Sequence, residues 1–150
     1  MIKYLLDTNI LVRSADVSSF THSLANEAIA QIIADGNKCV ITSQVLVEFW
    51  VVATRPTDVN GLGWSISQTK DYVNDLLNNF MLIPENIDIF PNWLRLVTDY
   101  NIKGKRSHDI RLLAVMKANN ISHLLTFNPQ DFIQLSDIII IQPQALINNS

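Results

Sequence analysis

The chain has 150 residues, of which 48% are hydrophobic and 17% are charged, which fits one globular domain with a sizeable core. A net charge of −3 excludes a protein that binds nucleic acid through an overall positive field, but not a nuclease built on a local cluster of acids. A single cysteine, Cys39, excludes an internal disulfide and a cysteine-rich zinc site.

The sequence also shows no sign of export or membrane insertion. Asp7 interrupts the first apolar residues too early for a signal peptide. No apolar run approaches the roughly 18 residues that a membrane-spanning helix needs. We therefore expect a cytoplasmic protein with a single domain over residues 1–150.

Hydrophobic periodicity predicts short strands that alternate with helices. Apolar runs predict strands over 2–6, 38–42, 81–83, 122–127 and 138–141. One-sided apolar patterns predict helices over 21–35, 44–54, 67–79, 87–100 and 108–118. Expected N-caps are Thr21, Ser43, Ser67 and Ser107, and Gly36 is expected to end the first helix. Continuously apolar strands separated by helices predict an α/β fold with a parallel sheet that is buried on both faces.

Acidic residues recur next to these predicted strands. Asp7 ends the first strand, and Glu48 lies in the helix after the second. Asp109 lies in the first turn of the helix before the fourth strand, and Asp131 follows that strand. Ligands of open α/β sheets bind at the carboxyl ends of the strands. If the first and fourth strands are neighbours, the four carboxylates converge on one edge.

Each acid taken alone also has a structural explanation. Asp7 fits a helix cap, and Glu48 could share a solvated helix face with Arg55. Asp109 suits the dipole of a first helical turn, and Asp131 suits a turn. The joint placement of the four acids is what favours a site.

Converging carboxylates need a partner, because each pair ~4 Å apart repels by about 4 kcal/mol at an effective dielectric constant near 20. Such a cluster shares protons or binds a hard cation. Oxygen donors without histidine or cysteine favour Mg²⁺ or Mn²⁺ over zinc. An ion of this kind suits the hydrolysis of phosphate esters.

Four segments together resemble the PIN domain family, and within it the VapC-like toxins of prokaryotic toxin–antitoxin pairs. They are Leu5–Leu11, Ser43–Phe49, His108–Ala114 and Leu124–Phe132, in the family's order and across almost the whole chain. The resemblance implies a three-layer α/β/α fold whose five-stranded parallel sheet has the order 3-2-1-4-5. It also implies a Mg²⁺- or Mn²⁺-dependent endoribonuclease, a homodimer and a small antitoxin partner.

The resemblance also assigns roles to residues. Asp7, Glu48 and Asp109 match three acids of the family's metal site. Asn128 takes a polar position in the fourth motif, where Asp131 is the nearest acid and completes the predicted catalytic set. The residues expected to contact RNA are Thr8, Asn9, Thr126, Asn128, Lys105 and Arg106.

Several alternatives remain open at this point. Lys103, Lys105 and Arg106 could hold RNA phosphates or form an ordinary solvated loop. The whole domain could be a catalytically inactive module that binds RNA or protein, or a nuclease that acts on DNA. Nucleotide-binding folds fit less well, because the sequence contains neither G-x-G-x-x-G nor G-x-x-x-x-G-K-[ST].

Overall fold

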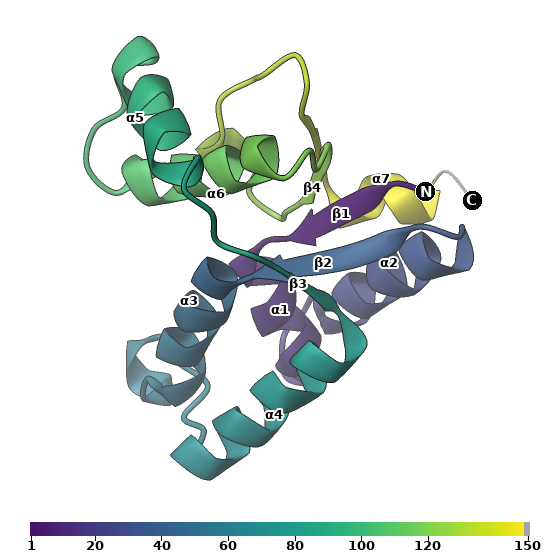
Figure 1. Ribbon diagram of the computed structural model, residues 1–150. Helices are drawn as coiled ribbons and strands as arrows, with labels where there is room; N and C mark the ends of the chain where they lie inside the picture. The colour runs from purple at the N-terminus through teal and green to yellow at the C-terminus, as the bar shows by residue number, and fades with distance from the viewer. Residues whose placement is uncertain (149–150) are drawn as a thin grey trace.

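The computed structural model describes residues 1–148 and places a parallel β-sheet at the centre of the molecule (Figure 1). Within these residues the strands are β1 (Lys3–Leu6), β2 (Lys38–Thr42), β3 (Met81–Ile83), β4 (His123–Leu125) and β5 (Ile139–Ile141). Their order is β3-β2-β1-β4-β5, and all neighbours pair in parallel. The predicted α/β class and strand order are confirmed.

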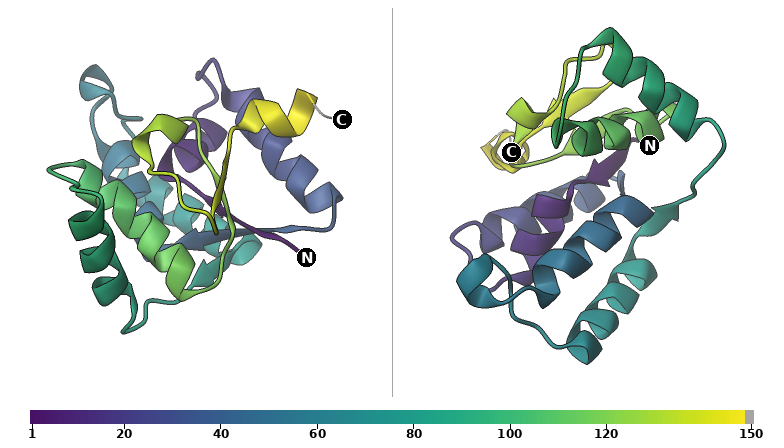
Figure 2. Two further views of the ribbon diagram at one scale, coloured as in Figure 1. Left: turned by 90° about the horizontal axis from the view of Figure 1, so that it is seen from above. Right: turned by 90° about the vertical axis from the view of Figure 1, so that its left-hand side faces the viewer.

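Helices cover both faces of this sheet, which gives the predicted three layers. The helices are α1 (Thr8–Ala15), α2 (His22–Ala34), α3 (Ser43–Thr54), α4 (Ile66–Asn79), α5 (Ile89–Asp99), α6 (Arg106–Ala118) and α7 (Pro143–Asn148). Short 3₁₀ turns are η1 (Thr57–Val59) and η2 (Pro129–Asp131). α5 and α6 pack together on one face, and α1 to α4 lie on the other, with α7 against α2 (Figures 1 and 2).

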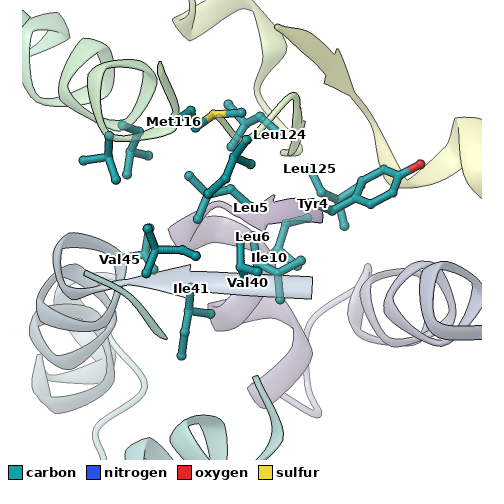
Figure 3. Close-up of a cluster of buried hydrophobic side chains, with 14 of the residues drawn as sticks. Tyr4, Leu5, Leu6, Ile10, Val40, Ile41, Val45, Met116, Leu124 and Leu125 are labelled. Atoms are coloured by element: carbon teal, nitrogen blue, oxygen red, sulfur yellow. The ribbon is translucent and has the colours of Figure 1, made fainter. Parts of the chain in front are cut away.

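The core lies around β1, the central strand. Leu5 and Leu6 have no exposed surface, and the neighbouring strands β2 and β4 contribute equally buried aliphatic side chains. Figure 3 shows these strand residues meeting Ile10, Val45 and Met116 from helices on the two faces. Burial on both faces explains why the strands are continuously apolar rather than alternating.

The predicted helix starts are partly wrong. The N-cap of α3 is Thr42 rather than Ser43, and the N-cap of α4 is Ser65 rather than Ser67. In both cases the hydroxyl oxygen accepts a hydrogen bond from the backbone N–H three residues further on. Two hydroxyl residues lie close together at each of these sites. The backbone geometry, which periodicity does not specify, selects between them.

The ends of α6 and α2 agree with the prediction only in part. α6 begins at Arg106, so Ser107 is inside the helix and does not cap it. Thr21 is the N-cap residue of α2, as predicted, but its side chain makes no capping hydrogen bond and instead accepts one from Arg13 (2.8 Å). Gly36 ends α2 with a positive φ of 83°, as expected of a left-handed residue after a helix. Two helices, α1 and α7, were not predicted from the sequence.

The register of β1 and β4 sets the position of the functional site. Leu6 is paired with Leu125, so Asp7 and Thr126 leave the sheet side by side. The chain builds β2 and β3 on one side of β1, and β4 and β5 on the other. The gap between β1 and β4 is thus the topological switch point, where open α/β sheets bind ligands. Among residues 1–148, none of the helices has the length and apolar character needed to cross a bilayer.

Candidate active site

Asp7 lies at the carboxyl end of β1 and is 8% exposed. Its backbone N–H donates to the carbonyl oxygen of Leu125 (3.0 Å), which extends the β1–β4 ladder. Its carboxylate accepts hydrogen bonds from the N–H of Thr8 (2.8 Å), the hydroxyl of Thr126 (2.8 Å) and the amide of Asn9 (3.3 Å). Asp7 is therefore both the N-cap of α1 and a fixed acid at the sheet edge.

The loop after β4 is tied to the start of α1 by the same residues. The side-chain oxygen of Asn9 accepts a hydrogen bond from the N–H of Phe127 (3.0 Å), and its amide donates to Thr126 Oγ1 (3.1 Å). Thr126 Oγ1 also accepts from the N–H of Asn128 (3.0 Å). Thr126 is fully buried, so the structure places it behind Asp7 as a support.

Glu48 reaches the same edge from the second turn of α3. Its Oε1 accepts a hydrogen bond from the hydroxyl of Thr8 (2.9 Å), so the first turn of α1 holds both Asp7 and Glu48. Glu48 is half-buried rather than on a fully solvated stripe. The chain links the two acids through Thr8, whose backbone N–H contacts one and whose hydroxyl contacts the other.

A pocket of about 470 Å³ brings the predicted acids together. Its lining residues are Asp7, Thr8, Asn9, Val12, Arg13, Glu48, Val51, Val52, Arg55, Asp109, Asn128 and Asp131. All four predicted catalytic acids are among them, and so are three of the residues expected to contact RNA. The other three lie elsewhere: Thr126 is buried beneath the pocket, and Lys105 and Arg106 are exposed outside it.

The acids influence one another across this pocket. Burial is the main cause that raises the pKa of Asp7 to about 6; the hydrogen bonds from Thr126 and Thr8 oppose the shift, while the charges of Glu48 and Asp109 add to it. The low polarity around a buried carboxylate favours its neutral form. Asp7 therefore holds its negative charge at a cost to the folded state.

Asp109 shows the same effect from the opposite side of the pocket. Burial is again the first cause that raises its pKa to about 6, followed by the charges of Asp131 and Glu48. The positive charges of His108 and Arg106 lower it in part. Arg106 therefore acts on the site electrostatically, although it does not line the pocket.

α6, which carries Asp109, is held against α3 by a short polar chain. Gln44 donates its amide to the carbonyl oxygen of His108 (2.8 Å) and accepts a hydrogen bond from Arg111 (3.1 Å). Arg111 also forms an ion pair with Glu85 (2.8 Å), just beyond β3. Gln44 lies one turn before Glu48 on α3, so these contacts set the distance between Glu48 and Asp109.

Two arginines in the pocket were missed from the sequence. Arg13 lies in the last turn of α1, and Arg55 is the residue at which α3 ends. The only signal in the sequence was the spacing of Glu48 and Arg55, which corresponds to about two helical turns and puts both on one side of α3. That spacing was compatible with a solvated stripe as well as with a site.

The donors in the pocket suit a hard divalent cation. They are carboxylate and amide oxygens, which Mg²⁺ and Mn²⁺ prefer. As they stand, no three acidic, histidine or cysteine side chains within residues 1–148 are close enough to hold a metal ion together. Burial is the main cause of the raised pKa values of Asp7 and Asp109, and the charges of neighbouring acids add to both shifts; a cation in the pocket would favour the charged form of each carboxylate. The donor chemistry fits, and binding would require the acids to draw closer.

The chain belongs to the PIN domain family, whose model matches residues 4–137. The match spans β1 to the residues just before β5, and so includes every acid of the pocket. The family predicted from four short motifs is thereby confirmed. A search of curated proteins found no match.

Several solved structures have a fold similar to that of this chain. A chain of VapBC2 from Rickettsia felis, solved with a promoter DNA fragment, is 20% identical, with a TM-score of 0.69 over 94% of this chain and 98% of that one. VapBC-1 from nontypeable Haemophilus influenzae is 16% identical, with a TM-score of 0.68 over 95% and 99%. VapC20 from Mycobacterium tuberculosis, described as a sarcin–ricin loop cleaving toxin, is 14% identical, with a TM-score of 0.61 over 81% and 86%. The protein therefore has a VapC-like fold.

Proposed function

We propose that this protein is a Mg²⁺- or Mn²⁺-dependent endoribonuclease and the toxin of a toxin–antitoxin pair, with residues 1–150 forming one nuclease domain. The observation that carries the proposal is the meeting of four acids, from four separate segments, in one pocket at the switch point of the sheet. Membership of the PIN domain family and the likeness to VapC20 support it.

Each acid has a role that follows from its position. Asp7 and Asp109 would hold the cation from opposite sides, and Glu48 would either complete that site or accept a proton from the attacking water. Asn128 and Asp131 would complete the pocket at the fourth position. The chemistry that such an ion supplies is activation of water and neutralisation of charge on the scissile phosphate.

The supporting residues keep this arrangement in place. Thr126 and Thr8 hold the carboxylate of Asp7, and Thr8 also orients Glu48 through its hydroxyl. Hydrogen bonds from a second layer of residues fix the direction in which a ligand points and are costly to remove. Thr8 thus serves as the link between the two acids.

The proposed partners rest on the structural neighbours. The matches include VapBC structures from Rickettsia felis and Haemophilus influenzae, a toxin–antitoxin complex from Klebsiella pneumoniae, and FitAB bound to a DNA fragment. We infer that a small antitoxin protein binds this chain. A homodimer and a cytoplasmic location are part of the same proposal.

The decisive experiment is cleavage of mixed single-stranded and structured RNA by the purified protein in Mg²⁺, Mn²⁺ or EDTA. We expect the parent protein to cleave only with metal and Asp7→Asn to be inactive. Asp75→Asn, a substitution on the exposed surface of α4, is the matched control and should cleave like the parent. Single-stranded DNA of the same sequences tests the choice of nucleic acid.

Two results would contradict the proposal. Metal-dependent cleavage by the Asp7→Asn, Asp109→Asn double variant would show that the acids do not form the site. A folded parent protein that cleaves nothing and takes up no metal in a calorimetric titration would be a binding module, the alternative that the sequence left open.

A further inference from the structure

Arg13 and Arg55 line the acidic pocket without pairing with its acids. Within residues 1–148 the ion pairs are Arg111–Glu85 and Lys117–Asp137, and neither lies in this pocket. Opposite charges that share a pocket normally gain by pairing. Here the fold keeps the two guanidinium groups apart from the carboxylates, so they are available to an external anion.

The separation of the charges follows from the two helices that carry them. α1 and α3 both start at the carboxyl edge of the sheet. Along α1, Arg13 lies about 9 Å beyond Asp7, and along α3, Arg55 lies about 10 Å beyond Glu48, at 1.5 Å of rise per residue. Each helix therefore presents an acid near the sheet and an arginine further out.

Arg13 is held in a fixed orientation before any ligand binds. Its guanidinium lies over the ring of Phe127, 4.9 Å from the ring centre, and its Nη1 donates a hydrogen bond to the hydroxyl of Thr21 (2.8 Å). The N–H of Phe127 is bonded to Asn9, which in turn contacts Asp7. The same set of contacts thus positions the arginine and the first acid relative to each other.

Arg55 is held through its backbone instead. The N–H of Gly63 donates to the carbonyl oxygen of Arg55 (2.9 Å). A Cβ on Gly61 would come within 1.9 Å of that oxygen, so only glycine allows this tight turn. No hydrogen bond from the Arg55 guanidinium occurs within residues 1–148, which leaves all of its N–H groups for a ligand.

We propose that Arg13 and Arg55 form a phosphate subsite that binds a phosphodiester of the RNA strand next to the one cleaved at the acids. This inference rests on the proposed nuclease function. The guanidinium fork matches the oxygens of a phosphate, and the RNA backbone repeats that anion along the strand. A strand lying along α1 and α3 would meet the acids with one phosphate and the arginines with a neighbouring one.

The test is RNA binding by protein that carries Asp7→Asn, which stops cleavage while the strand is bound. Binding of a fluorescent, mixed-sequence single-stranded RNA is measured in EDTA over a series of salt concentrations. Each phosphate contact with a single strand contributes about 0.7 to the slope of log affinity against log salt. Arg13→Gln and Arg55→Gln should each lower that slope by about 0.7 and weaken binding by about fivefold or more at low salt.

Three controls separate charge from structure. Arg95→Gln removes an exposed arginine of α5 that lies outside the pocket, and should leave the slope unchanged. Thr21→Val removes the hydrogen-bond partner of Arg13 but no charge, so a purely structural role of Arg13 would appear there as well. Arg13→Lys should keep the slope, because the charge is retained.

The outcomes distinguish this subsite from the nuclease proposal. An Arg13→Gln, Arg55→Gln double variant that binds RNA with the original slope, or an absence of RNA binding by the folded protein, would overturn the subsite. Metal-dependent cleavage by the parent together with either result would leave the nuclease intact. If the protein binds RNA through these arginines but never cleaves it, the subsite would be supported and the nuclease proposal would be contradicted.

Discussion

The two sides of the acidic pocket are built differently. On the β1–β4 side, Asp7 is buried and its carboxylate accepts three hydrogen bonds. On the α6 side, Asp109 and Asp131 are only partly buried, and no hydrogen bond contributes to the shifted pKa of Asp109. The first side is fixed by the sheet, whereas the second is carried by a helix and a short loop.

The two sides also differ in the contacts that hold their backbone in place. α6 starts at Arg106 without a side-chain cap, packs against α5 through its buried face, and is joined to α3 by the contacts of Gln44. The first N–H groups of a helix have no partner within the helix, whereas the backbone N–H of Asp7 is bonded to Leu125 in the sheet ladder. Asp7 is therefore held by more hydrogen bonds than the acids of the α6 side.

The largest expected effect is on RNA cleavage, and it concerns Asp109 on the α6 side of the pocket. Asp109→Asn should reduce the rate of RNA cleavage at least ~10²-fold, because it removes a proposed metal ligand. Asp131→Asn and Asn128→Ala should each cost about tenfold if they support the site from its outer layer. Initial rates at saturating Mg²⁺ measure this. Equal losses for Asp131→Asn and Asp109→Asn would instead make Asp131 a direct ligand.

The next effect is on stability, and it concerns the buried side. Asp7→Asn should stabilise the metal-free protein at pH 7.5 by at most about 3 kcal/mol. It removes a buried carboxylate whose pKa is raised from 3.8 to about 6. Loss of a favourable acceptor reduces the gain. Urea unfolding in EDTA measures the difference, and Asp75→Asn should leave the stability within about 0.5 kcal/mol.

The same pKa shift predicts a pH dependence with a definite sign. The folded chain binds the proton of Asp7 more tightly than the unfolded chain does, so the contribution of Asp7 to stability is most favourable below pH 3.8 and is lost as the pH rises through about 6. The advantage of Asp7→Asn over the parent should therefore shrink as the pH falls from 7.5 to 4. A constant advantage across that range would contradict the assignment.

Added Mg²⁺ should remove most of the stability advantage of Asp7→Asn over the parent. Mg²⁺ at a hundred times its dissociation constant should raise the unfolding free energy of the parent by about 2.7 kcal/mol. It should do little for Asp7→Asn, because this variant lacks the proposed metal ligand at the end of β1. Thermal unfolding with and without EDTA gives the comparison, and an equal Mg²⁺ effect on both proteins would place the ion elsewhere.

The smallest effects compare the supports of the two sides. Thr126→Val should destabilise the fold by about 2 kcal/mol, because it removes a buried hydrogen bond to a carboxylate and leaves other polar groups unpaired. Gln44→Ala breaks a more exposed contact and should cost less than about 1 kcal/mol. Thr98→Val on the outer surface of α5 is the control. A larger loss for Gln44→Ala would mean that the α6 side is the rigid one.

Much of the fold could be predicted from apolar patterns. The five strands and five of the helices were found because burial on both faces makes strands uniformly apolar and burial on one face gives helices their period. α1 was missed because it has only 8 residues, which is too short for the helical period of its apolar residues to stand out. The caps of α3 and α4 were misplaced because two hydroxyl residues competed at each position.

Local sequence pattern was enough to indicate which acids lie near the site and which elements carry them. Only the tertiary structure decided that Thr126 lies behind Asp7, and that Arg13 and Arg55, rather than Lys105 and Arg106, line the pocket. These positions depend on the pairing of β1 with β4 and on how α1 packs against α3. Contacts between segments so far apart in the sequence leave no trace in local periodicity.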